Sequence, residues 1–413
     1  EEKTLYGDNN ETFKSNRTII ISGHYTETIS GLQNITIYQN KNITVNSDTN
    51  ETYKGFRSIL ISGNHSEIIS GDVTTTIVGA STETFKSNRT ITISGSFTET
   101  ITGNNTLKVT GNNFETITLD KSILISGDLK QTIQGNNSID IISNSTEIYR
   151  KNRDITTHGN LSETIHKNFD LQVKGNFNED CNGHRTIKIS GHFKETVDGM
   201  HNKTIMSVSR ETYKGNRTII ISGSLVETIS GSSTFDYFHT LDLTVHNDVS
   251  ITHKQNRNVI ISGALKETIT GSRTLLVSGD TIEEYNANRT LIITGDNTET
   301  ITGTRIFHVS GLNSETYLSS RTITTSNDHT ETISGFKNLT ISGTNNLLVN
   351  LHNTEIYKSD RTVTIDGTLV ETITGTRILV VSGNTTETYD SSRNVYISGN
   401  TVDVIEGASS QTY

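Results

Sequence analysis

The sequence predicts an all-β fold: an intertwined homotrimeric triangular β-helix, or β-prism, built from octapeptide repeats. Three observations lead to this prediction. An eight-residue pattern runs from Lys3 to Ser410 without insertion or deletion, so these 408 residues form 51 octads. No window shows the apolar spacing of three and four residues that is typical of a helix. Proline is absent from all 413 residues, as expected of strands that are paired on both sides.

The octad is clearest in the stretch Glu211 to Thr234, which is ETYKGNRT, IIISGSLV, ETISGSST. We letter its positions a to h. Positions a, c and g share one face of a strand, whereas h, b and d share the other. Position c is apolar in nearly every octad, so we expect it to point into a core, with the small polar residues outside. The core residues predicted on this basis are Ile21, Ile29, Tyr213, Ile221, Ile229 and Ile301.

A corner is expected after each strand, at positions e and f. Position e is usually Gly and position f is often Asn, Asp or Ser, which tolerate positive φ or form local side-chain turns. Leu119, Lys167 and His239 occupy position e elsewhere, so the corner favours Gly without requiring it. The turn residues predicted in this way include Gly23, Gly31, Gly95, Gly223 and Gly231.

Composition indicates a thin core on a single long shaft. Only 31% of the residues are hydrophobic and the mean hydropathy is -0.42, which is polar for a domain of this length. The net charge of -10 argues against a nucleic-acid surface, and no apolar run is long enough for a transmembrane helix. No break divides residues 1–413. Because the chain begins at Glu1 without Met, we expect a fragment of a longer chain.

Basic residues recur at a second, longer spacing, which bears on how many chains form the β-helix. Octads of the form ET(F/Y)xxxR place a basic residue at position g, in steps of 32 or 40 residues: Arg17, Arg57, Arg89, Lys121, Arg153, Arg185, Arg217, Arg257, Arg289, Arg321, Arg361 and Arg393. A single-chain triangular coil would use three octads per turn, so it would stack features that recur at multiples of three octads. Three intertwined identical chains make all faces equivalent at each level. We therefore interpret the rhythm, which steps by four or five octads, as favouring the trimer.

The candidate reactive residues favour structural roles. Glutamates recur at position a with the octad and form no unique pair, so we predict no catalytic site; we expect them near corners, paired with the Arg at position g or hydrated. Cys181 is expected to be a buried, inert thiol. His253, at position c, is the best candidate for a metal ligand on a three-fold axis; no other metal or cofactor site is predicted.

Asn-x-Thr sequons, for example at Asn16, Asn88, Asn216 and Asn288, are interpreted as turn chemistry and not as glycan acceptors. The octad itself generates them, because it places Asn at the corner and Thr two residues later, at position h.

The phrases ISG and ITG within unbroken octads, as in Ile29-Ser30-Gly31, Ile93-Ser94-Gly95 and Ile301-Thr302-Gly303, resemble the C-terminal β-helical needle of contractile-tail central spike proteins, the phage tail spikes and VgrG-like proteins. The resemblance covers essentially the whole chain. It implies a homotrimer that drives through a membrane or cell envelope. The oligosaccharide-binding-like and lysozyme domains that can precede such needles, and a metal-bearing tip, have no counterpart in this sequence.

From this resemblance we expect a non-enzymatic spike or needle shaft of a contractile injection system or virus particle, located in a virion or an extracellular injection apparatus. Its expected partners are two further copies of the chain, baseplate or tail proteins at one end, a tip protein at the other, and transiently a target membrane; nucleic acid is not expected.

Four alternatives remain to be compared with this expectation. A virion-surface or capsid spike would use the same shaft. A monomeric solenoid adhesin of 45.4 kDa is the alternative if the chain does not trimerise. An ice-binding face would need a flat array of Thr on one side of a monomer, but position b varies among Thr28, Ile20, Lys108 and Leu276. A polysaccharide-cleaving tailspike would need irregular insertions, which the octad phase excludes.

Overall fold

The computed structural model describes residues 2–412 and is all-β there, with 52 strands and no helix. Strand β1 spans Glu2–Leu5 and β52 spans Ser409–Thr412. Between them, five-residue strands begin every eight residues, from β2 (Asn9–Phe13) and β3 (Arg17–Ile21) to β51 (Thr401–Ile405). Each strand runs from position g to position c of the octad, as predicted, and three residues form each corner.

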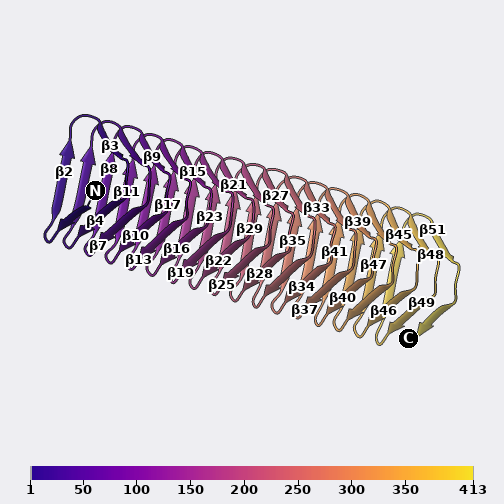
Figure 1. Cartoon of the computed structure of the whole chain (residues 1–413). Helices are drawn as coiled ribbons and strands as arrows, with labels where there is room; N and C mark the ends of the chain where they lie inside the picture. The colour runs from indigo at the N-terminus through magenta and orange to yellow at the C-terminus, as the bar shows by residue number, and fades with distance from the viewer. Residues whose placement is uncertain (1, 413) are drawn as a thin grey trace. The chain divides into compact units, whose positions relative to one another are not determined.

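The strands form a parallel β-solenoid of about 17 turns, with three strands per turn. Within the compact parts of the chain, strands pair in parallel with the strand one turn later, and a turn takes 24 residues. Strand β10 (Val73–Ile77), for example, pairs with β7 (Thr49–Tyr53) and β13 (Phe97–Ile101). Every third strand therefore belongs to the same sheet: the first sheet contains β1 and β4 (Tyr25–Ile29), the second begins with β2, and the third with β3. The successive turns can be followed in Figure 1.

The chain divides into two compact units, residues 1–207 and 208–413, which we call unit 1 and unit 2. Unit 1 contains β1 to β26 (His201–Ile205), and unit 2 contains β27 (Ser209–Tyr213) to β52. Each unit has the same three sheets and therefore holds between eight and nine turns of solenoid.

The interior of each unit is narrow and is filled by positions c, a and g. Burial alternates along a strand: the pattern is buried, exposed, buried, exposed, buried in β22 (Phe169–Val173) and β43 (Lys337–Ile341), and the outward residues are partly exposed in strands such as β38 (Asn297–Ile301). The predicted core residue Ile21 is 7% exposed, Tyr213 is 1% exposed, and Ile29, Ile221, Ile229 and Ile301 are fully buried. Hydroxyl and amide side chains at h and b face outward, because neighbouring residues in a strand point to opposite faces.

The corners depend on glycine for a reason other than the one expected. No residue in the described chain has positive φ. Instead, a Cβ added to Gly159 would lie 2.2 Å from the carbonyl oxygen of Gly135, in the preceding turn. The Gly159 N–H donates to that same oxygen at 3.0 Å. Glycine is thus required at this corner by the close approach of two turns. The predicted turn residues Gly23, Gly31, Gly95, Gly223 and Gly231 all lie in corners between strands. A Cβ at Gly31 or Gly95 would also meet the preceding turn, whereas nothing lies within 4 Å of one at Gly23.

Side chains at position f also join one turn to the next. The Asn16 side-chain oxygen accepts the backbone N–H of Asn40 at 3.1 Å, and the Asn88 oxygen accepts that of Asn112 at 2.8 Å. The members of this asparagine ladder, which ends on the N–H of His184, are Asn16, Asn40, Asn64, Asn88, Asn112, Asn136 and Asn160. The recurrence of Asn at this corner, in every third octad, was a sequence signal for the length of the turn, and the octad analysis missed it.

The intertwined trimer was predicted from steps of four and five octads between basic residues, and the structure removes the basis of that argument. Because these steps are not multiples of the three-octad turn, most of the basic residues have uncharged neighbours on the adjacent rungs of their own sheet. Arg153, for example, lies between Leu129 and Phe177. Arg17 beside Lys41 is an exception, as is Arg361 beside Lys337. Separating like charges explains the rhythm within one chain; the oligomeric state stays a prediction.

Candidate functional site in the polar interior

The candidate site is the polar interior of the solenoid, where most of the charged residues at positions a and g are enclosed. The expectation that the glutamates lie near corners was wrong. They occupy the middle of their strands and face inward, because position a shares its face with the core position c. Glu27, Glu267, Glu299, Glu331 and Glu371 are 4 to 9% exposed, whereas Glu67 and Glu99 are only half-buried.

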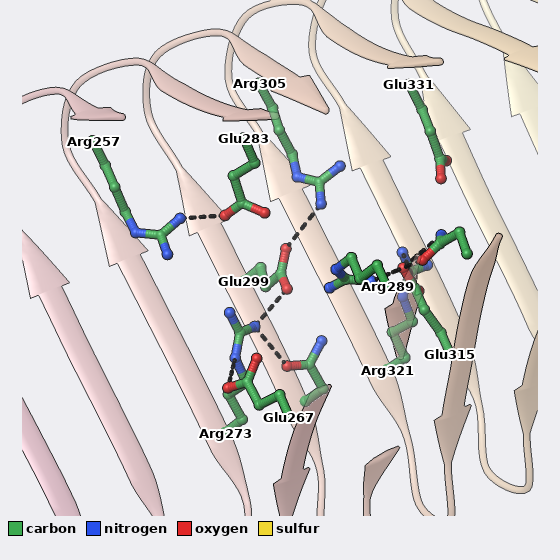
Figure 2. A network of polar contacts seen from close by, with 12 residues as sticks. Arg257, Glu267, Arg273, Glu283, Arg289, Glu299, Arg305, Glu315, Arg321 and Glu331 are labelled. Atoms are coloured by element: carbon green, nitrogen blue, oxygen red, sulfur yellow. Dashed lines mark hydrogen bonds and ion pairs between the residues drawn. The ribbon is translucent and has the colours of Figure 1, made fainter. Parts of the chain in front are cut away.

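A simple positional rule describes the ion pairs. A glutamate at position a meets the residue at position g on the next strand, 6 residues later, and the one a turn before, 26 residues earlier. Glu299 illustrates both contacts: Arg273 lies 2.5 Å away and Arg305 lies 3.5 Å away (Figure 2). Glu147 does the same with Lys121 at 3.7 Å and Arg153 at 2.9 Å. The length of the turn therefore produces the ion-pair spacing.

Unit 2 contains a continuous series of such pairs. Arg289 contacts Glu315 at 2.5 Å, and Lys337 contacts Glu331 at 2.8 Å; Arg257 also pairs with Glu283 (Figure 2). Burial alone would raise the pKa of Glu299, but Arg273 and Arg305 outweigh it and lower that pKa to about 2. These carboxylates are therefore ionised and paired, as buried charges must be.

The ET(F/Y)xxxR octads form a recurrent unit in which the Arg lies over the aromatic ring and, in the Tyr octads, the hydroxyl bonds to the glutamate. In one example the Tyr213 hydroxyl donates to Glu211 at 3.0 Å, and the Arg217 guanidinium lies 4.7 Å from the ring centroid. Such a stack combines a charge-assisted hydrogen bond with a cation–π contact. Further tyrosines that bond to the preceding glutamate and carry an Arg over the ring are Tyr53, Tyr149, Tyr285, Tyr317, Tyr357 and Tyr389.

Two of these tyrosines join glutamates stacked on adjacent rungs. The Tyr53 hydroxyl lies 2.9 Å from Glu27 and 3.0 Å from Glu51. Like charges stacked at this spacing repel each other, and the shared hydroxyl reduces that cost. Burial raises the pKa of Glu51 and the charge of Arg57 lowers it. Burial has the larger effect, so the pKa is raised overall. In unit 2 the Tyr357 hydroxyl bridges Glu331 and Glu355 in the same way, at 3.1 and 2.8 Å.

Unit 1 encloses a polar cavity of about 160 Å³. Its charged lining comprises Lys41, Glu51, Arg57, His65, Glu67, Glu83, Arg89, Glu99, Glu115, Lys121, Glu147, Arg153, Glu163 and Glu179. Glu99 and Glu163 break the positional rule. The two partner positions of Glu99 hold Val73 and Asn105, and those of Glu163 hold Asn137 and Phe169. Burial raises the pKa of both carboxyls to about 7.

His253 is fully buried in unit 2, as its place at position c predicts. Its Nδ1 lies 3.1 Å from the Ser233 hydroxyl, its Nε2 lies 3.9 Å from a Glu227 oxygen, and Phe235 packs edge-on against the ring. These contacts are sufficient to explain the residue as a hydrogen-bonded core histidine. Within the described chain, no cluster of three or more His, Cys, Asp or Glu side chains is arranged to hold a metal ion.

Cys181 is 1% exposed, and burial, followed by the nearby Glu179 charge, raises its pKa. A thiol in that state is a poor nucleophile. The sequons at Asn16, Asn88 and Asn288 use their side-chain oxygens to accept a backbone N–H of the next turn, which agrees with their interpretation as turn chemistry.

The described part of the chain has no helix that is long and apolar enough to cross a membrane. Comparisons with protein-family models, with curated proteins and with solved structures found no match to this chain.

Proposed function

We propose that this chain is a non-catalytic structural shaft, which transmits force or holds a functional end away from a particle or cell. The observation that carries the proposal is the uniform geometry of the solenoid: every corner between the described strands has three residues, and no turn carries an inserted loop. Solenoids that bind or cleave a substrate need side chains that converge in an open cleft. Here the glutamates at position a and the cations at position g face the interior.

The energetics of the interior suit a mechanical role. Each inner strand is hydrogen-bonded to the turns before and after it, and a glutamate such as Glu299 is paired with cations from two different turns. Separating two turns would break the backbone ladder and also leave buried charges without partners, which costs several kcal/mol per pair. A shaft built in this way resists bending and local unfolding.

The most specific form of the proposal is a spike or needle shaft of a contractile injection system or virus particle, acting as a homotrimer in envelope penetration. Its support is the resemblance of the octads to contractile-tail needles. In a trimer, a strand would pair with the next octad of a neighbouring chain. That one-octad register brings the same octad positions together as the intrachain three-octad register, so the core pattern is compatible with both.

The second candidate is a single-chain shaft of a cell-surface adhesin or virion-surface spike. One observation favours it: the asparagine ladder from Asn16 to Asn160 is uniform only in a register of 24 residues. In a one-octad register, these asparagines would alternate with other residues, such as His24 and Leu32. A ladder of identical side chains hydrogen-bonds best when the chain pairs with itself.

The deciding experiment is the mass and sedimentation of the purified chain. A mass near three times 45.4 kDa with strongly elongated hydrodynamics would support the trimeric spike, for which 51 octads at ~4.8 Å per octad give roughly 245 Å. An elongated particle of 45.4 kDa would support the single-chain shaft, roughly 80 Å long at ~4.8 Å per turn. A compact particle with globular hydrodynamics would contradict both.

A further inference from the structure

The cavity inside unit 1 is large enough for several water molecules. Its volume is about 160 Å³, whereas one water needs roughly 10–15 Å³ of such volume. The residues that line it extend from Lys41 to Ile187, so the cavity follows the axis through successive turns of unit 1. A cavity in unit 2, lined by residues between Arg321 and Arg393, has a volume of about 60 Å³.

The lining of the unit 1 cavity has too few cations for its carboxylates. Eight glutamates line it with five Arg and Lys residues and one His, and one of the eight, Glu179, also pairs with Arg185 outside the lining. The unit 2 cavity between Arg321 and Arg393 has four glutamates and five Arg and Lys residues. A buried carboxylate without a counter-charge is costly, so the carboxylates of the unit 1 cavity that lack one must take up either a proton or a cation.

Two of these glutamates have neither an ion pair nor a hydrogen bond. Glu99 lies between Thr75 and Ile123 on the adjacent rungs of its sheet, and Glu163 lies between Ile139 and Ile187. Both line the cavity and are half-buried because they face it. Every other glutamate of the lining contacts a cation, a His or a Tyr.

Within the described chain, two residues of the same lining carry a polar atom that lacks a hydrogen-bond partner. The hydroxyl of Thr49, a residue that is 2% exposed, has none, and the same is true of Nδ1 of His65, which is 4% exposed. Both residues line the cavity. Orphaned polar atoms around a polar cavity indicate ordered water. The space therefore offers water and carboxylate oxygens together, which are the ligands that hard cations prefer.

We propose that the cavity of unit 1 holds small monovalent cations, bound with their water beside Glu99 and Glu163. The valence follows from the spacing of the carboxylates. No three acidic or His side chains of the described chain converge, so each unpaired glutamate offers one negative charge and neighbouring waters complete the coordination. The chain would enclose the ions as it folds.

Protons compete with the cations for these two carboxyls. Burial is the main cause that raises the pKa of each to about 7, and nearby charges adjust it: Glu83, Arg57, Arg89 and Glu115 around Glu99. The charges that adjust the pKa of Glu163 are those of Glu147, Arg153, Lys121 and Glu179. Cation binding is therefore expected above pH 7 and should be lost at pH 5, where both carboxyls carry protons.

The test is to refold the full chain at pH 8 in RbCl, or in N-methylglucamine chloride at equal ionic strength. We expect a higher Tm in RbCl, with a saturable dependence on its concentration, and no difference between the two salts at pH 5. In the double variant Glu99→Gln, Glu163→Gln the Tm should be equal in both salts. The matched control Glu299→Gln removes a paired glutamate that does not line the cavity, and should keep the RbCl dependence.

A crystal of the wild-type chain refolded in RbCl gives an independent readout, which does not depend on any variant folding. We expect anomalous rubidium peaks inside unit 1, next to Glu99 or Glu163. Equal Tm values in the two salts at pH 8 would overturn the proposal. So would a RbCl effect that persists in the double variant, or an anomalous map without rubidium in the cavity.

Discussion

Units 1 and 2 share one octad frame and yet ionise their interiors differently. Glu299 in unit 2 contacts Arg273 and Arg305, and its pKa falls to about 2. Glu99 in unit 1 occupies the same octad position with Val73 and Asn105 at the two partner positions, and burial raises its pKa to about 7. The repeat therefore fixes where a charge is buried, whereas single residues one turn away decide whether that charge is paired.

The largest expected effect comes from breaking a buried pair in unit 2. Arg289 is 4% exposed and contacts Glu315 at 2.5 Å and the Asn313 side chain at 3.2 Å. Arg289→Ala removes one of the cations around Glu315 and should lower the free energy of unfolding by about 3–5 kcal/mol. Arg210→Ala, at an exposed outward position of β27, is the control and should change it by less than about 0.5 kcal/mol. Urea unfolding measures both, and similar losses would contradict the enclosed network.

The next effect is a pH dependence of opposite sign at the unpaired Glu99 and Glu163 of unit 1 and at the paired Glu299 of unit 2. The pKa of Glu99 and of Glu163 is raised in the folded state, from 4.5 to about 7. The stability that each contributes is therefore fully present below pH 4.5 and is lost as the pH rises through 7. A shift of this size corresponds to at most ~3 kcal/mol per group. The pKa of Glu299 is lowered to about 2, so its contribution is present above pH 4.5 and is lost as the pH falls towards 2.

Hydrogen exchange of the full chain between pH 4 and pH 8 tests this contrast, because it assigns protection to each unit. Between pH 5 and pH 8, amides around Glu99 and Glu163 should lose protection, and those around Glu299 should not. Glu99→Gln should flatten the change in unit 1. The contrast is wrong if both units respond with the same sign, or if Glu99→Gln leaves the profile unchanged.

A smaller effect is expected at the corners of unit 1. Gly159→Ala would place a Cβ against the carbonyl of Gly135, 2.2 Å away, whereas nothing lies within 4 Å of a Cβ at Gly23. Neither residue has positive φ. We expect Gly159→Ala to cost about 1–3 kcal/mol through overpacking, and Gly23→Ala to be neutral or to stabilise by up to about 1 kcal/mol. Thermal unfolding compares the two; equal Tm values would show that turn contact does not select glycine.

The smallest effect concerns the side-chain bonds at position f, which also differ between the units. Unit 1 has the unbroken asparagine ladder, whereas corners of unit 2 mix acceptors such as Asp280, Asn288 and Ser320. Asn112→Ala removes the acceptor for the Asn136 N–H, at 3.0 Å, and should cost about 1 kcal/mol. Leu32→Ala, at an exposed corner position, should cost less than about 0.5 kcal/mol. Equal urea midpoints would show that the ladder contributes nothing.

Much of the interior could have been predicted once the turn length was known. The strand positions followed from the octad, and Ile29 and Tyr213 are buried because position c lies on the inner face of every strand. The pairing rule that links Glu299 to Arg273 reaches into the previous turn, and so it is visible only when the octads are aligned in threes. Without that register, Glu99 and Glu299 look equivalent in the sequence. The recurrence of Asn in every third corner, at Asn16, Asn40 and Asn64, is the local signal that would have supplied it.

The outer faces of the sheets also could not be predicted without knowing which octads are neighbours. Position b looked irregular in sequence order because it mixes the three sheets. In the structure the first sheet of unit 1 carries Thr28, Thr52, Thr76 and Thr100 in direct register, while Ile20 lies on the third sheet and Lys108 on the second. The argument against a regular Thr array from position b therefore does not apply to this sheet.

The sequence by itself determined that each octad is one strand and one corner and that positions a, c and g face inward, because alternation along a strand and the reach of a short corner are local properties. Only the tertiary structure decided which octads are neighbours, since any register of whole octads superposes the same positions. That choice set the ion pairs, the uniform ladders and the excess of carboxylates in the unit 1 cavity, because each of these depends on contacts between residues a full turn apart.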